Sequence, residues 1–214
     1  IGNGGGVVYA PLGPTHLSIE DIAILRVIPN MTIVAPCDAQ EMLRLMPKTV
    51  DWPHPLYIRL AKGGDKVVSR DDLDFEIGKA ILMQSPKDGL FVTTGVMTQK
   101  AMDAAKQLSE EGIECGVLHM HTIKPLDHEV LEELIPEVEA VVTVEEHFRT
   151  GGLGSSVLES CSDLIPEHVS KITRIGIPDQ FPDKYGSQES LLEYLDITIE
   201  SIKNTMRIKL KKNN

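Results

Sequence analysis

The sequence predicts an α/β protein with two domains. Three observations carry this prediction: short apolar runs rich in β-branched residues recur along the chain, segments with helical spacing separate them, and a charged stretch without periodicity divides the chain into two blocks. Strands that alternate with helices at such intervals pair in parallel and are covered by helices. We therefore expect a first domain over residues 1–64, a linker over 65–76, a second domain over 77–207 and a basic tail over 208–214.

The first block predicts two helices and two buried strands. A turn at Gly13-Pro14 precedes a helix whose apolar face covers residues 19–28. Ser18 and Asp21 are spaced as the N-cap pair of this helix. The further expected elements are the end of this helix at Pro29-Asn30, a strand over 31–34, a helix capped by Asp38 and Glu41, and a strand over 56–60.

The second block shows the same alternation. Gly112 follows a helix at the position where a left-handed glycine commonly ends one. The terminal KNTMRIKLKKNN is basic, and we expect a solvated, frayed end because disorder concentrates at chain termini. The expected strands cover 89–94, 113–120, 140–144 and 171–175, and the expected helices cover 98–111, 126–134, 151–164 and 188–207.

Composition excludes several classes of protein. The 214 residues carry 21 Lys and Arg against 32 Asp and Glu, a formal net charge of −11, which argues against general binding of nucleic acid or anionic membranes. No apolar run approaches the roughly 20 residues that span a bilayer. The three cysteines lack CxxC spacing and indicate reduced thiols in a cytoplasmic protein. The chain opens at Ile1 without a signal peptide, so we treat it as a possible fragment of a longer polypeptide.

The sharpest candidate for chemistry is His16, in Gly13-Pro14-Thr15-His16 ahead of the first helix. Ligands of open α/β sheets bind at the carboxyl ends of strands and at helix N-termini, where free N–H groups favour oxygens. A histidine there can donate a hydrogen bond or move a proton near neutral pH. The alternative is a surface or capping histidine.

Lys62 and Arg59 are the second candidates, in PLYIRLAKGG. Lys62 follows the expected strand and would project from its carboxyl edge, where a cation suits a sugar phosphate or carboxylate. The alternative is an ordinary solvated lysine. Arg59 lies inside the strand, where the favoured interpretation is a structural ion pair.

Two further polar clusters favour structural roles. Glu145 and Glu146 are adjacent, so their side chains should point to opposite faces of an extended segment, beside His147. His119 and His121 share one strand face, but no further ligand completes a zinc set at the usual spacing, so we expect no metal site. The glycines of GNGGG and GGLG match no nucleotide-binding pattern.

Taken together, these segments resemble a known family. GPTHLSIEDIAILRVIPNMTIVAP and PLYIRLAKGG resemble the pyrimidine-binding domain of transketolase-like thiamine diphosphate enzymes. TTGVMTQKAMDAAKQL, GVLHMHTIKPLD and VTVEEHFRTGGLGSSVLE resemble the transketolase C-terminal domain. The resemblance covers nearly the whole chain and implies an incomplete parallel-sheet pyrimidine-binding domain followed by a smaller α/β domain. 1-Deoxyxylulose-5-phosphate synthase and the beta subunits of 2-oxo acid dehydrogenases share this architecture.

The resemblance implies roles for individual residues. His16 matches the family histidine that contacts substrate oxygens in the active-site channel, and Lys62 stands where members carry an arginine for substrate phosphate. Arg59 is carried as a further substrate-binding candidate. Leu12 departs from the acidic residue that often precedes the GPTH motif and contacts a substrate hydroxyl.

The resemblance also implies what this chain lacks. The carboxylate that activates the aminopyrimidine and the aromatic residue that stacks on it find no match here, and diphosphate and magnesium belong to another domain. We therefore expect thiamine diphosphate and magnesium only in the complete enzyme, with all their ligands outside this chain. Alone, the chain should be inactive and should need a missing N-terminal region or a partner subunit, with the site at the interface of a homodimer.

The implied activity is transfer of a two-carbon ketol unit between phosphorylated sugars through a thiamine-bound carbanion. The absent cofactor residues and Leu12 also motivate an alternative, a non-catalytic module for dimerisation or regulation. A subunit of one of the two related thiamine enzymes is a further alternative.

Overall fold

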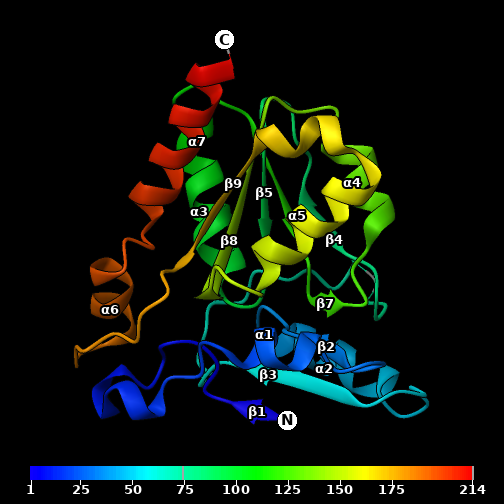
Figure 1. Cartoon of the computed structure of the whole chain (residues 1–214), viewed down its shortest axis with the longest axis vertical. Helices are drawn as coiled ribbons and strands as arrows, with labels where there is room; N and C mark the ends of the chain where they lie inside the picture. Colours follow the sequence, from blue (N-terminus) through cyan, green and yellow to red (C-terminus); the bar gives the residue numbers. More distant parts are fainter. Residues whose placement is uncertain (74, 214) are drawn as a thin grey trace.

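The computed structural model describes residues 1–73 and 75–213, and in this part of the chain the strands form two sheets (Figure 1). The first sheet has the strand order β1-β3-β2-β7, with β7 antiparallel to β2 and the other pairs parallel. Helices α1 (Asp21–Arg26) and α2 (Ala39–Lys48) belong to this unit. Its strands are β1 (Gly2–Asn3), β2 (Thr32–Val34), β3 (Leu56–Leu60) and β7 (Thr122–Lys124).

The second sheet has the order β4-β6-β5-β8-β9, parallel except for the β4–β6 pair. Its strands are β4 (Ile81–Gln84), β5 (Gly89–Thr93), β6 (Cys115–His119), β8 (Ala140–Phe148) and β9 (Ile172–Ile177). The helices are α3 (Met97–Ser109), α4 (His128–Leu134), α5 (Leu153–Leu164), α6 (Gln188–Tyr194) and α7 (Ile199–Asn213). These elements confirm the two-domain α/β prediction, and within this chain the second unit is the larger one.

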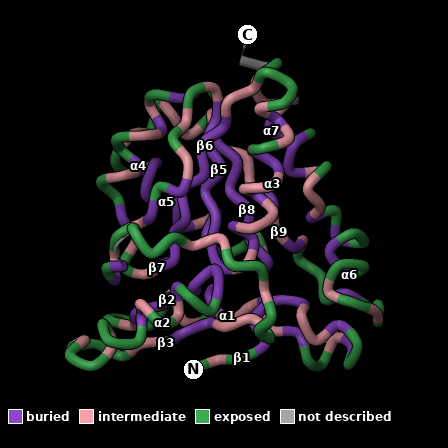
Figure 2. Tube along the Cα trace, turned by 180° about the vertical axis from the view of Figure 1, so that it is seen from behind, coloured by how far each residue is buried: buried purple, intermediate pink, exposed green. Residues whose placement is uncertain are grey.

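The core lies on both faces of the second sheet, as the buried central strands in Figure 2 show. Alternate residues of β5 enter different clusters: Leu90 and Val92 pack with residues of α4 and α5, whereas Phe91 packs with residues of α3 and α7. A strand buried on both faces reads as a continuous apolar run, which is what the sequence shows here. Among the described residues, no helix combines the length and the apolar character needed to cross a bilayer.

Strand β7 physically joins the two units. It follows β6 of the second sheet along the chain, yet it pairs with β2 of the first sheet, with Ile33 opposite Lys124 and Val34 opposite Thr122. The sequence did not predict β7 or β4, because each is a short segment without clear alternation. The linker prediction over 65–76 meets no helix or strand in its described part, but Val68 and Ser69 donate their backbone N–H groups to the Asp38 carboxylate.

Local signals predicted the helix starts unevenly. Asp38 caps α2 as predicted, accepting a hydrogen bond from the Glu41 backbone N–H at 2.9 Å. Ser18 is not the N-cap of α1, which is Glu20. The reason is that the backbone of Ser18 exchanges two hydrogen bonds with Gly6, at 2.7 and 3.1 Å, and so belongs to the edge of the sheet.

The C-terminal prediction was wrong in two respects. The expected helix over 188–207 is two helices, because the chain turns through Leu195–Thr198 with Asp196 at a positive φ of 57°. The expected frayed tail over 208–214 is helical through Asn213, since α7 packs on the second sheet by burying Met206 and, in part, Leu210. Residue 214 lies outside the described residues.

Gly6 has a structural reason to be glycine. Its φ of +84° is unfavourable for other residues, and a Cβ atom at this position would lie 2.4 Å from Cδ of Glu146 in β8. The glycine therefore lets the end of β1 approach the second unit closely enough for the Val7 N–H to reach the Glu146 carboxylate at 2.7 Å.

We predict that Gly6→Ala lowers the free energy of unfolding by about 3 kcal/mol, combining backbone strain with displacement of Glu146. Gly63→Ala is the matched control, because Gly63 also has a positive φ (+94°) but no atom within 4 Å of the added Cβ. Backbone strain alone should cost about 1 kcal/mol there. Urea denaturation of both variants gives the comparison, and equal losses would show that the close approach contributes nothing.

Candidate functional site at the carboxyl edge of the first sheet

The carboxyl ends of parallel strands β1, β2 and β3 meet at one edge of the first sheet. A cavity of about 190 Å³ opens there, in the position where α/β sheets bind ligands. It is lined by Asn3, Pro36, Cys37, Asp38, Ala39, Met42, Leu60, Ala61, Lys62, Gly63, Gly64, Asp65 and Val96.

Lys62 lies at this edge, two residues beyond the end of β3. Its side chain is exposed, and Nζ lies 5.9 Å from the ring centroid of Tyr9. The Tyr9 hydroxyl in turn accepts a hydrogen bond from Asn3 at 3.3 Å. The structure thus places a cation at the carboxyl edge, with an aromatic ring beside it.

His16 lies on an excursion of the chain that leaves and rejoins the same edge. The excursion starts where Gly4 and Gly5 donate N–H groups to the Leu60 carbonyl, and it ends where Ser18 pairs with Gly6. His16 itself is exposed, in the 3₁₀ turn Pro14–His16, with Nδ1 3.0 Å from the Thr15 hydroxyl. The expectation that His16 sits at a helix N-terminus was wrong, because α1 begins only at Asp21.

Arg59 forms the structural ion pair that the sequence predicted. It is 7% exposed, and its Nε donates to Asp21 Oδ2 at 2.9 Å. One terminal nitrogen also donates to the carbonyls of Ser18 and Glu146, at 2.9 and 3.0 Å. The guanidinium therefore holds α1, the returning excursion and β8 together, and a direct contact with substrate stays a prediction.

Glu145 and Glu146 diverge as predicted, although both lie within β8 rather than after it. Glu145 accepts backbone N–H groups of Leu153 and Gly154 at 2.7 and 2.9 Å, at the start of α5, and burial raises its pKa to about 7. Glu146 accepts from the Val7 N–H on one side and from the Gln188 amide, at 3.0 Å, on the other. These carboxylates act as connectors between elements.

His147 is a buried neutral acceptor. Its Nδ1–H donates to the Phe148 carbonyl at 2.8 Å, which leaves Nε2 to accept the Ala23 N–H in the first turn of α1 at 3.3 Å. Burial lowers the pKa of this imidazole to about 4, and the nearby Arg59 charge acts in the same direction.

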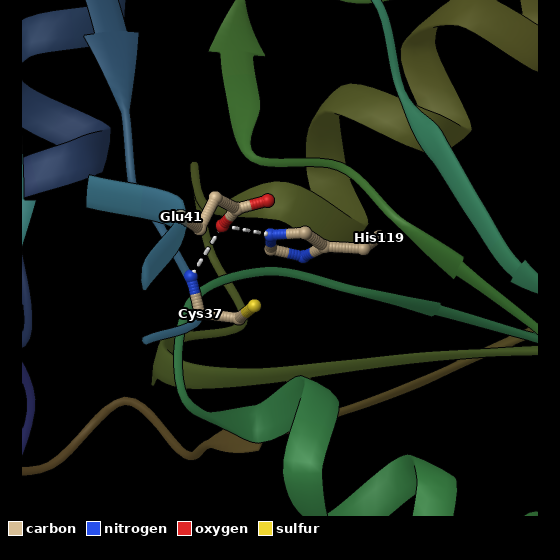
Figure 3. A group of neighbouring side chains, drawn as sticks. All are labelled: Cys37, Glu41 and His119. Carbon is tan, nitrogen blue, oxygen red and sulfur yellow. Dashed lines mark hydrogen bonds and ion pairs between the residues drawn. The ribbon is translucent and has the colours of Figure 1, made fainter. Parts of the chain in front are cut away.

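His119 and His121 lie at the junction between the two units, as the interface interpretation predicted. His121 stacks on Phe75 with ring centroids 4.0 Å apart, and His119 Nε2 lies 2.8 Å from Glu41 Oε2 of α2. The sequence missed that Cys37 and Glu41 lie beside His119 (Figure 3). No spacing rule could have found this group, because its members come from residues 78 positions apart.

The donor set at this edge does not fit a magnesium ion. Asp38 lines the cavity, but its carboxylate already accepts three backbone N–H groups, from Glu41, Val68 and Ser69, together with the Ser69 hydroxyl. Mg²⁺ needs oxygen ligands that are free, and the positive charge of Lys62 opposes a second cation. This edge suits an anion, and the expectation that the magnesium ligands lie outside the chain stays a prediction.

Comparison with known proteins gives matches over most of the chain. The transketolase pyrimidine-binding domain model matches residues 4–64, and the transketolase C-terminal domain model matches residues 78–202. One of the two subunits of an apulose-4-phosphate transketolase, from Phocaeicola vulgatus, is 39% identical over 195 residues, which covers 91% of this chain and 61% of the relative. A 1-deoxy-D-xylulose-5-phosphate synthase of Rhodopirellula baltica is 34% identical over 198 residues, 92% of this chain and 31% of the relative.

A solved structure agrees with the fold over nearly the whole of this chain. A split-gene transketolase in an inactive beta4 tetramer superposes with a TM-score of 0.88 at 35% identity, covering 99% of this chain and 66% of that chain. The chain spans about half to three fifths of the length of the transketolase relatives that it matches.

The buried His147 predicts a pH-dependent stability. Its pKa is about 4 in the folded chain and about 6.5 when unfolded, so the unfolded chain binds the proton more readily. The stabilisation is complete above pH 6.5 and is lost as the pH falls toward 4. Between pH 7.5 and pH 5 the native chain should lose about 2 kcal/mol more of its free energy of unfolding than His147→Gln does. Urea denaturation at both pH values measures this, and parallel losses in the two proteins would contradict it.

Proposed function

The chain belongs to the transketolase family, and from that premise we propose that it forms the C-terminal part of an enzyme that transfers a two-carbon ketol unit between phosphorylated sugars. Membership of this family implies dependence on thiamine diphosphate. The observation that carries the proposal is the placement of an exposed imidazole, His16, and an exposed cation, Lys62, at the carboxyl edge of one sheet.

In this proposal Lys62 binds the phosphate of the sugar. It lies over the Tyr9 ring and beside the Gly63-Gly64 turn, so the side chain can extend toward an anion without disturbing the sheet. Compared with an arginine, a lysine keeps the positive charge but loses the bidentate geometry. Its partner should therefore be an anion held by charge.

His16 holds a substrate oxygen and assists proton transfer. The Thr15 hydroxyl beside Nδ1 can fix the ring orientation, which leaves Nε2 toward solvent and a bound sugar. Exposure of the ring supports this role, since a histidine buried among apolar neighbours could not reach a substrate. Thiamine diphosphate would supply the bond-breaking chemistry from protein outside this chain.

A partner subunit completes the site in this proposal. One relative is named as a subunit, and one similar structure is of a split-gene transketolase. Helix α1 also leaves Ile24 60% and Val27 80% exposed, as a surface that a partner could cover. A homodimeric assembly and a cytoplasmic location stay predictions.

The second candidate is a 1-deoxyxylulose-5-phosphate synthase. The identity to such an enzyme over 92% of the chain favours it, and so does Leu12, which is 53% exposed on the same excursion as His16 and has no carboxylate for a sugar hydroxyl. Product analysis separates the two: transfer to an aldose acceptor indicates the first activity, and release of carbon dioxide from an oxo acid donor indicates the second. A chain that forms dimers but supports neither reaction would be a non-catalytic module.

We predict that His16→Ala lowers the turnover of the assembled enzyme at least about tenfold, because a positioned acid–base group is lost. His54→Ala is the matched control, since His54 is another exposed histidine of the first unit and does not line the cavity. Steady-state kinetics with saturating thiamine diphosphate and magnesium provide the measurement. Unchanged turnover in the His16 variant would contradict the role.

We predict that Lys62→Ala raises the KM for a phosphorylated substrate about 10- to 100-fold, as expected for loss of a charge-assisted contact. Lys62→Arg should retain most of the affinity, and Lys48→Ala, at an exposed lysine ending α2, should change nothing. The KM for a substrate analogue without phosphate should stay the same in all variants. A rise for both substrates would assign Lys62 to the fold instead.

A further inference from the structure

We propose that Cys37, Glu41 and His119 form a zinc site that links the two units of the chain. The three side chains converge in Figure 3, and each is fully buried. One possible ligand atom from each, the thiol sulfur, a carboxylate oxygen and a ring nitrogen, lies within 4.8 Å of the others. This inference goes beyond the proposed function and does not depend on it.

Local structure brings the three residues together. The Asp38 cap fixes the start of α2, so that Cys37 precedes the helix and Glu41 points back over it. Glu41 Oε2 accepts the Cys37 backbone N–H at 2.6 Å, which holds the carboxylate beside the thiol. His119 ends β6 of the second sheet and reaches the same point from the other unit.

An unpartnered oxygen points independently to a ligand. Glu41 is fully buried, and its Oε1 has no hydrogen-bond partner within the described residues, although Oε2 has two. Leaving a buried carboxylate oxygen unsatisfied costs about 1–3 kcal/mol. A metal ion bound by Oε1 removes this cost while Oε2 keeps the Cys37 N–H.

The surroundings of His119 suit a metal ligand. Its Nδ1 lies 2.8 Å from the Thr98 hydroxyl, which lies 2.9 Å from the Thr93 hydroxyl. A histidine that binds zinc through Nε2 commonly donates its other ring N–H to such a neighbour. Because hydroxyl groups can rotate, the Thr98–Thr93 pair can accept the Nδ1–H of the metal-bound tautomer and also serve the tautomer that donates from Nε2 to Glu41.

The donor set selects zinc among common divalent ions. Thiolate, imidazole and carboxylate are zinc ligands, whereas Mg²⁺ and Ca²⁺ require oxygen donors throughout. Ligand atoms around tetrahedral Zn²⁺ lie roughly 3.3–3.8 Å apart, so small side-chain rotations would bring these three onto one ion. Binding forms a Zn–S bond and releases the Cys37 thiol proton to solvent, while the His119 proton moves to Nδ1.

The cavity at the carboxyl edge supplies an entry route and the fourth ligand. Cys37 and Asp38 line this cavity of about 190 Å³, which has room for a water molecule on the ion. A zinc ion there would join α2 of the first unit to β6 of the second, replacing one hydrogen bond by three coordinate bonds.

The test is titration of the untagged full chain with Co²⁺ as a spectroscopic probe for zinc, with Cys161→Ser as the matched control. Cys161 is also a buried free thiol, in α5, but it belongs to another core cluster. The wild type and Cys161→Ser should bind one equivalent with a thiolate-to-cobalt absorption band that Zn²⁺ displaces. Cys37→Ser should lose the band and at least about tenfold in affinity.

A second measurement keeps the proposal testable if Cys37→Ser does not fold. X-ray absorption at the zinc edge of the wild-type protein should show one sulfur ligand, and the same spectrum should persist in a Cys115→Ser, Cys161→Ser double variant, where Cys37 is the remaining thiol. One equivalent of Zn²⁺ should also raise the Tm. Ligation by nitrogen and oxygen alone, or no stoichiometric binding, would overturn the proposal.

Discussion

The buried Arg59 guanidinium is the interaction on which the arrangement of this molecule depends. It neutralises Asp21 at the start of α1 and donates to carbonyl groups of Ser18 and Glu146, so that one side chain fixes a helix, a loop and a strand of the other sheet. Removing one partner of a buried pair leaves an uncompensated charge, which commonly costs several kcal/mol. The sheet edge and the junction are therefore held as one rigid unit, and the position of the exposed His16 depends on it.

The two units are joined by polar groups that are almost fully satisfied, in addition to apolar packing. Strand β7 extends the first sheet, Glu146 bridges Val7 and Gln188, and His147 accepts an N–H group from α1. Buried polar connections of this kind fix orientation more strongly than apolar contacts, because any other arrangement would leave donors and acceptors unpaired. The cavity edge is consequently held rigidly while Lys62 and His16 remain exposed on it.

This division between buried and exposed polar groups explains how the chain can contribute to chemistry without holding a cofactor. The carboxylate nearest the cavity, Asp38, is occupied in capping α2 and anchoring the segment after β3. What the edge offers a ligand is a cation and an imidazole. Those groups suit a phosphorylated sugar, and the remaining chemistry must come from another protein surface.

The sequence by itself determined the alternation of strands and helices, the Asp38 cap and the opposed directions of Glu145 and Glu146, because these follow from periodicity and local hydrogen bonding. It also placed Lys62 after a strand and Arg59 in an ion pair. Only the tertiary structure decided that β7 leaves its own sheet, that Ser18 pairs with Gly6 and that Cys37, Glu41 and His119 meet. The physical reason is that these contacts join residues far apart in the chain, where no local spacing records which surfaces will be buried against each other.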